Sequence, residues 1–240
     1  MDILSHIRSN PKCVQAILQQ SKVSRPLVSE PIEVKCWKAD YLVSRYVYEM
    51  YRSGVLPFPL ETLSESECNQ CQTFTTQVLP TLMKYRKQEC EGAIEAQTCL
   101  GKMGELVAAK TMAKHMDIIG PDFTIYKGGQ KSWDADLFSG DMVKQYAVKT
   151  CVPHLHEPSW TFQCGSDRQD KKFFTQPINP NLFAVFVVFD VSLKTGRVFS
   201  VVPATHTVQH FESPIDIALR DEKRIIYYET LIKNGLILGI

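Results

Sequence analysis

The middle of the sequence contains three charged residues whose types suit the hydrolysis of a phosphodiester: Glu105, Asp136 and Lys149. In this reaction a water must lose a proton, and negative charge develops on the phosphoryl group that it attacks. A hard divalent cation bound by carboxylate oxygens promotes both events. A lysine adds a second positive charge that orients or activates the water. The residue types therefore favour metal-dependent phosphodiester hydrolysis.

A helix is expected to position Glu105. Segment 98–116 has apolar residues at helical spacing, with Leu100, Met103 and Val107 on one face and Glu105 on a neighbouring face. A turn region with Gly-Pro and Gly-Gly pairs follows it.

Two short strands joined by a tight turn are expected to position the other two residues. The first strand, over 133–138, carries Asp136 and, on the same face, Asp134. The turn is predicted at Ser139-Gly140-Asp141, and the second strand follows it as far as Thr150.

The second strand places Lys149 on the same face as Ala147, because side chains alternate along a strand. Val148 then points the other way, into the core. The backbone carbonyl of Val148 is a further candidate metal ligand, since it is a neutral oxygen beside the two carboxylates.

The order of these features resembles the PD-(D/E)xK nuclease superfamily, which includes many type II restriction endonucleases, Holliday-junction resolvases and phage exonucleases. The features are Gly-Glu on a helix, Asp on a strand and a hairpin into Val-Lys-Thr, within roughly residues 98–205. The resemblance implies that Glu105 and Asp136 (or Asp134) hold Mg²⁺, for which Mn²⁺ can substitute, and that Lys149 is the catalytic lysine. It also implies a restriction-endonuclease-like mixed sheet flanked by helices.

Ala147 departs from the family's pattern, which usually has Glu, Asp or Gln two residues before the lysine. The alanine removes one metal ligand. Asp134 or a water molecule is the candidate replacement.

The loop after Lys149 is the expected substrate-facing region. It mixes polar, aromatic and basic side chains, which suit phosphate contacts, base-edge hydrogen bonds and stacking. The candidate DNA-binding residues are Thr150, His154, His156, Trp160, Gln163, Arg168, Lys171 and Lys172. The alternative for this loop and for the hairpin before it is an ordinary solvated surface with scattered charges.

Two other motifs in the sequence partly match known site patterns. Glu33-Val34-Lys35 spells the acid-x-lysine element in full, but no aspartate-bearing strand precedes it. Cys68 and Cys71 have the spacing of zinc ligands, yet no second Cys-x-x-Cys follows. Cys90, Cys99 or the pair His206 and His210 would have to complete a zinc site from afar.

The sequence divides into a mostly helical N-terminal region, 1–97, and an α/β (α+β) core, 98–240. In the first region, helices are expected to start near Ser9-Asn10-Pro11, to run over about 39–52, and to begin again at the capping sequence Ser64-Glu65-Ser66-Glu67. The charged segment 84–95 is expected to be solvated.

Two strands are predicted late in the core. The run 181–190 is apolar at nearly every position, which is typical of a central strand buried on both faces. A turn at Lys194-Thr195-Gly196 leads to a second strand over 197–202, and residues 225–228 fit either a late strand or a helix.

Composition limits the class of protein. Of the 240 residues, 44% are apolar, which is enough to bury a core and excludes wholesale disorder. The net charge of +1 neither requires nor excludes a nucleic-acid partner. No apolar run reaches the ~20 residues of a membrane helix, and the N-terminus lacks the pattern of a secretory signal. We therefore expect a cytoplasmic, intracellular protein whose eight cysteines are reduced.

The sequence thus predicts a Mg²⁺-dependent endonuclease that cleaves double-stranded DNA, similar to the enzymes of restriction-modification systems. A homodimer is expected if the target is palindromic, because two-fold protein symmetry mirrors two-fold DNA symmetry. The first alternative, favoured by Ala147, is a non-catalytic nucleic-acid-binding protein that retains the nuclease fold. A structural or interaction protein is the second.

Overall fold

A mixed six-stranded sheet forms the centre of the computed structural model, in the order β1-β7-β6-β4-β3-β2. Strands β4 and β6 are parallel, whereas every other neighbouring pair in this sheet is antiparallel. The strands are β1 Glu61–Thr62, β2 Ile118–Ile119, β3 Leu137–Ser139, β4 Gln145–Cys151, β6 Leu182–Asp190 and β7 Thr195–Pro203.

The structure describes residues 58, 60–85, 90–126, 134–152, 159–164, 169–191, 193–214, 223–227, 230, 231, 234 and 236. The helices expected near Asn10 and over 39–52, and the motif Glu33-Val34-Lys35, lie outside these residues.

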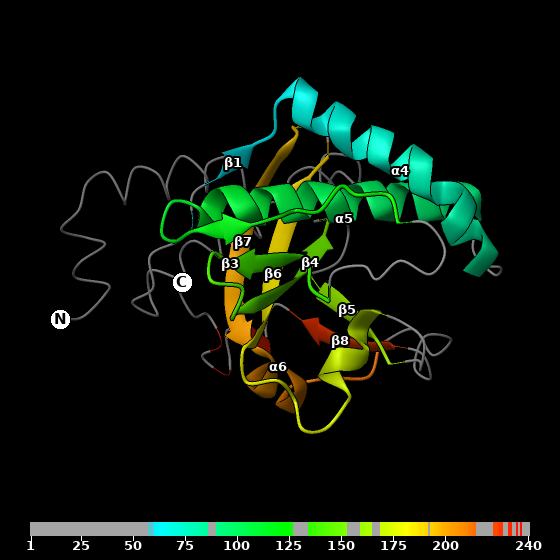
Figure 1. Ribbon diagram of the computed structural model, residues 1–240. Helices are drawn as coiled ribbons and strands as arrows, with labels where there is room; N and C mark the ends of the chain where they lie inside the picture. The colour runs from blue at the N-terminus through cyan, green and yellow to red at the C-terminus, as the bar shows by residue number, and fades with distance from the viewer. Residues whose placement is uncertain are drawn as a thin grey trace, which may run out of the picture.

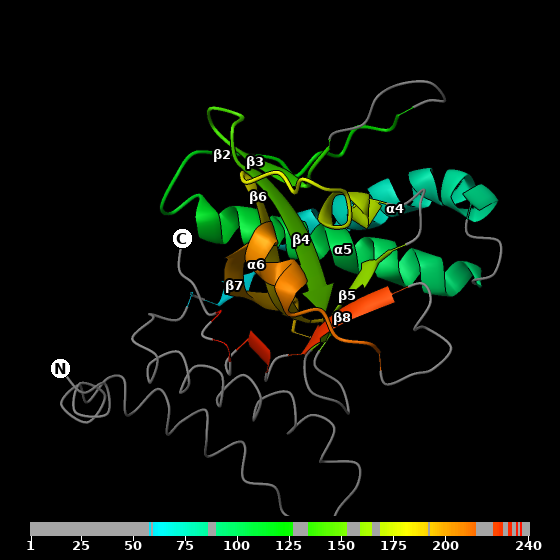
Figure 2. The same cartoon turned by 90° about the horizontal axis from the view of Figure 1, so that it is seen from below.

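The sheet is covered on both faces. Helix α5, Glu91–Met112, lies across one face, and α4, Glu65–Tyr85, packs on the outer side of α5 (Figure 1). On the other face lie a two-stranded sheet of β5, Ser159–Gln163, and β8, Lys223–Tyr227, the 3-10 helix η1 and the short helix α6 (Figure 2). Helix η1 spans Gln169–Phe173 and α6 spans Ala204–Gln209. The architecture is therefore mixed α and β, as predicted.

Apolar sequence explains the central strands. Six consecutive residues of β6, from Ala184 to Phe189, are buried, because helix α5 packs on one side of the strand and the second sheet on the other. The prediction of a strand buried on both faces is confirmed. The close approach of α5 to β7 depends on Gly196, where a Cβ would come within 2.8 Å of Val107 Cγ2.

The predicted start of α4 is also confirmed. Ser64 Oγ accepts a hydrogen bond from the backbone N–H of Glu67 at 3.2 Å, and Glu67 Oε2 accepts one from the backbone N–H of Ser64 at 2.7 Å. This reciprocal pair satisfies donors that the first turn of a helix leaves without partners. Pro80 lies inside α4 and does not divide it.

One prediction about the region before residue 98 is wrong in detail. The charged segment 84–95 is not simply solvated, because α5 begins at Glu91 and Ile94 is fully buried. The predicted boundary at residue 97 therefore falls inside a helix. Strand β1 moreover pairs with β7 of the core sheet, so the described part before residue 98 packs as one body with the core.

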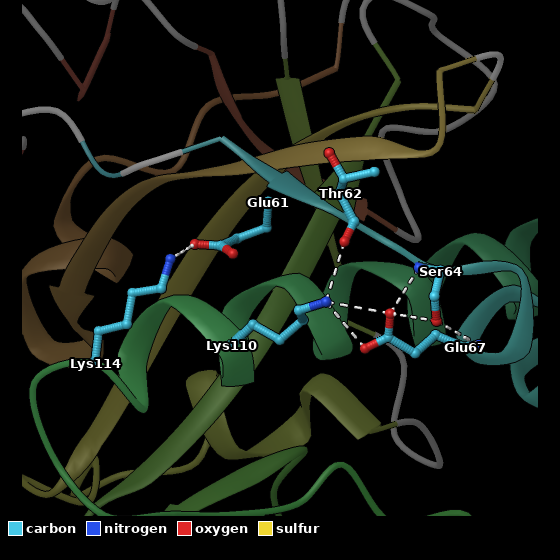
Figure 3. A network of polar contacts seen from close by, with 6 residues as sticks. All are labelled: Glu61, Thr62, Ser64, Glu67, Lys110 and Lys114. Carbon is cyan, nitrogen blue, oxygen red and sulfur yellow. Dashed lines mark hydrogen bonds and ion pairs between the residues drawn. The ribbon is translucent and has the colours of Figure 1, made fainter.

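Polar contacts hold the edge strand β1 against the two helices (Figure 3). Lys110 of α5 donates to the carbonyl oxygen of Thr62 and to Glu67 Oε1, both at 3.0 Å. Lys114, just past the end of α5, pairs with the buried carboxylate of Glu61. These contacts join three elements that are distant in the sequence.

Within the described residues, no helix combines the length and the apolar character that a bilayer crossing requires. The six described cysteines form no disulfide bond.

The contact between α5 and β4 gives a first prediction. At Gly104 an added Cβ would lie 1.8 Å from Thr150 Oγ1 and 2.8 Å from Thr150 Cβ, so Gly104→Ala forces the helix away from the strand. We expect a loss of ~1–3 kcal/mol in the free energy of unfolding, measured by urea denaturation.

Gly101→Ala is the matched control, because nothing lies within 4 Å of a Cβ at this position of the same helix. It should stabilise the protein by ~0.5–1 kcal/mol through helix propensity. Equal effects of the two substitutions would contradict the tight contact.

Candidate functional site

The candidate site lies at the edge where β3 leaves β4. Strand β3 begins only at Leu137, so the predicted strand over 133–138 is wrong at its start, and Asp134 and Asp136 precede β3 in a bent segment. The backbone N–H of Asp136 still donates to Tyr146 O at 3.1 Å. At the next position along β4, the Asp136 carboxylate replaces a backbone carbonyl as the acceptor: its Oδ2 accepts a hydrogen bond from the N–H of Val148 at 2.8 Å.

This arrangement leaves oxygen atoms at an open strand edge. The N–H and C=O of one strand residue point to the same side, so the Val148 carbonyl lies on the edge that Asp136 occupies. Asp136 Oδ1 accepts no hydrogen bond from any residue that the structure describes. The edge therefore offers one carboxylate oxygen and one carbonyl oxygen.

Glu105 faces this edge from α5. The residue is only 8% exposed, and its Oε2 accepts a hydrogen bond from Lys102 Nζ at 2.6 Å. Burial, and after it the negative charge of Asp136, raises the pKa of Glu105 to about 8, although Lys102 acts in the opposite direction. Burial and the neighbouring Asp136 charge therefore favour the protonated, neutral form of the Glu105 carboxyl group.

Lys102 is held in place by three neighbours besides Glu105. Its Nζ donates to the carbonyl oxygen of Asp122 at 2.9 Å and lies 4.9 Å from the ring centre of Phe74 and 5.6 Å from that of Phe123. The aromatic rings favour a cation at this point. Lys102 thus supplies part of the positive charge that the two acids require.

Lys149 approaches from the opposite side of the sheet. Thr150, its neighbour on β4, points at α5, and Lys149 therefore points towards the second layer. Its Nζ pairs with the buried carboxylate of Asp170 in η1 and lies 5.0 Å from the ring centre of Phe162. Ala147 shares this face and is buried.

Helix η1 also contributes Lys172, whose Nζ donates to the backbone carbonyl of Asp134 at 2.7 Å. Burial lowers the pKa of Lys172. The ammonium group of Lys149 also lowers it, whereas the charges of Asp136 and Asp170 raise it. Lys172 therefore lies within the electrostatic reach of the two aspartates and the lysine, and it joins the two sides of the site.

Asp136 is the group that links the predicted catalytic residues. Its charge acts on Glu105 on the α5 side and on Lys172, beside Lys149, on the η1 side. Asp134 is exposed, and its backbone carbonyl accepts the hydrogen bond from Lys172.

Two of the predicted substrate-binding residues have buried side-chain groups. Trp160 is 1% exposed, packs against Phe186 and Phe199, and donates from Nε1 to Val187 O, so no face of its indole ring is open for stacking. Thr150 Oγ1 is buried against Gly104 of α5.

The remaining predicted contacts divide into two groups. Lys171 is exposed, and Gln163 is half-buried at the end of β5. His154, His156 and Arg168 lie outside the residues that the structure describes.

The donor set fits a hard divalent cation held by two carboxylates and a carbonyl. Glu105, Asp136 and the Val148 carbonyl would hold it, and they are the oxygen ligands that Mg²⁺ prefers. The buried position of the Glu105 carboxyl group beside Asp136, where a bound cation would stabilise its ionised form, is the observation that supports this fit. Among the described residues, no group of three or more His, Cys, Asp or Glu side chains could hold a metal ion.

The cysteines of α4 do not fit a zinc site. Cys68 and Cys71 are buried, and among the described residues they belong to no group of three or more His, Cys, Asp or Glu side chains that could hold a metal ion. Cys99 of α5 lies near them, but its Sγ contacts Gln72 Oε1 at 3.4 Å.

Sequence reasoning missed Asp170 and Lys102. Asp170 stands in a run of polar and basic residues with no motif spacing to Lys149, and only the fold brings the two together. The signal for Lys102 was its position three residues before Glu105 on the same helix, because this spacing brings two side chains into contact.

Comparison of the chain with protein-family models, with curated proteins and with solved structures found no match.

The raised pKa of Glu105 gives a prediction about stability. Between its unfolded value, near 4.5, and about 8, the folded protein retains a proton that the unfolded chain has released. The free energy of unfolding therefore falls as pH rises through this window, by about 1.4 kcal/mol per unit at most.

Glu105→Gln should remove this dependence. In EDTA, we expect the variant to be more stable than the wild type at pH 8.5 and equal to it within ~0.5 kcal/mol at pH 5. Urea denaturation at the two pH values measures this, and a variant that is less stable at pH 8.5 would contradict the crowding of Glu105 and Asp136.

Proposed function

We propose that this protein is a Mg²⁺-dependent endonuclease that hydrolyses phosphodiester bonds of double-stranded DNA, related to type II restriction enzymes of the PD-(D/E)xK superfamily. The observation that carries the proposal is the position of Asp136, between Glu105 on one side of the sheet edge and the Lys149 and Lys172 cations on the other. Strands β6 and β7 extend the sheet beyond β4, which supports the restriction-endonuclease-like fold.

Each group has a role in this proposal. Glu105, Asp136 and the Val148 carbonyl hold the cation, which when bound lowers the pKa of a water and offsets charge on the phosphate. Mn²⁺ substitutes for Mg²⁺. Lys149 orients the water and stabilises the negative charge that develops. Exposed Lys171 contacts the DNA backbone.

The exposed lysine and the charged edge suit a duplex that approaches β3 and η1 from outside. A palindromic target would be bound by a homodimer, since each copy then cuts one strand. The proposed location is the cytoplasm, where such an enzyme meets DNA.

A non-catalytic DNA-binding protein is the second candidate. Buried Ala147 favours it, because the family's usual acid is absent on the face of Lys149. Binding to DNA that persists in EDTA, with no cleavage under Mg²⁺ or Mn²⁺, would select this candidate.

Lys149→Met tests the proposed catalytic role. With supercoiled plasmid and Mg²⁺, the wild type should nick or linearise the DNA, and the variant should cut ~100-fold more slowly, which is the usual cost of removing one charge-stabilising group. The methionine retains most of the apolar stem against Phe162.

Lys144→Met is the matched control. Lys144 immediately precedes β4 and lies 5.8 Å from the ring centre of Phe183, away from the two acids. The Lys144→Met variant should cut DNA at the wild-type rate. Equal cutting by wild type and Lys149→Met would rule out the assignment of Lys149.

A further inference from the structure

Lys149 does not lie alone in the site, because a carboxylate from another element holds its ammonium group. Asp170, in η1, pairs with Lys149 Nζ through Oδ1. The side chains of both residues are largely buried, with 18% of Lys149 and 8% of Asp170 exposed. A buried pair of this kind fixes the direction of a flexible lysine.

The second oxygen of Asp170 is also engaged. Asp170 Oδ2 accepts the backbone N–H of Gln163 at 2.9 Å, at the end of β5. This bond orients the carboxylate so that Oδ1 is directed at Lys149. Since both oxygens have partners, Asp170 is suited to hold the lysine rather than to bind a cation.

The same short helix fixes the opposite wall of the site. Lys172, two residues after Asp170, donates to the backbone carbonyl of Asp134 and so holds the segment that leads into Asp136. Helix η1 therefore contacts both Lys149 and the segment that leads into Asp136.

We propose that Asp170 is a positioning residue that orients Lys149 towards the phosphate, where the lysine positions the attacking water and stabilises the negative charge that develops. This inference rests on the proposed nuclease function. Asp170 carries no metal ligand role, and its loss leaves binding of the cation and of DNA intact.

Four proteins test the inference: the wild type, Asp170→Asn, Lys149→Met and the double variant. A labelled DNA duplex is cut under single-turnover conditions with Mg²⁺, and DNA affinity is measured with Ca²⁺ in place of Mg²⁺. Asp170→Asn should cut ~10- to 100-fold more slowly, as expected for a misplaced catalytic group, with an unchanged Kd for DNA and for Mn²⁺.

The double variant distinguishes positioning from a general structural role. If Asp170 acts through Lys149, the double variant cuts no more slowly than Lys149→Met alone, because the lysine that Asp170 orients is already gone. The inference would be overturned if the fold-loss of cutting rate in the double variant equalled the product of the two single-variant losses. A wild-type cutting rate for Asp170→Asn would also overturn it.

Two further variants make the outcome decisive. Asp170→Glu retains the charge and should recover part of the cutting rate lost in Asp170→Asn, even if the asparagine variant is less stable. Equal cutting rates for Asp170→Glu and Asp170→Asn would count against orientation by charge. Asp141→Asn is the matched control, since Asp141 also accepts hydrogen bonds from a backbone N–H and from a side-chain donor, in the β3–β4 turn.

A wild type that leaves DNA intact overturns the proposed function and this inference together, whereas an active enzyme unaffected by Asp170→Asn overturns the inference alone.

Discussion

The hydrogen bond from the Val148 N–H to the Asp136 carboxylate determines the geometry of the candidate site. It replaces the backbone partner that β3 would provide if it continued, and so it ends the pairing of β3 with β4 without leaving the N–H group of Val148 unsatisfied. The same contact places a carboxylate at the edge of β4. Substitution of Asp136 would therefore affect both the local backbone and any cation bound there.

Charge is distributed unevenly around this bond. On the α5 side, burial and the charge of Asp136 raise the pKa of Glu105, and Lys102 acts in the opposite direction. On the η1 side, Lys149 is paired with Asp170. The charges of Asp136 and Asp170 both act on Lys172. A bound divalent cation would relieve the first side, and the second side would present positive charge to a phosphate. The two halves are complementary in the way that phosphodiester hydrolysis requires.

The sequence predicted those features that local pattern determines. The apolar run that forms β6, the capping residues of α4 and the turn before β4 are correct because each depends on neighbouring residues. The strand ahead of Asp136 was predicted too long, because a side-chain bond ends the pairing and no sequence pattern marks it. Trp160 was assigned to the surface because an indole suits stacking equally well on a base or on Phe186. Asp170 was missed because its partner lies on another element.

A structure determined after soaking crystals in Mn²⁺ would test the candidate metal site most directly. Its anomalous signal should show one ion bonded to carboxylate oxygens of Glu105 and Asp136 and to the Val148 carbonyl, at the ~2.0–2.3 Å typical of hard cations with oxygen ligands. An ion bound elsewhere, or Glu105 turned away from Asp136 with no ion between them at saturating Mn²⁺, would contradict it.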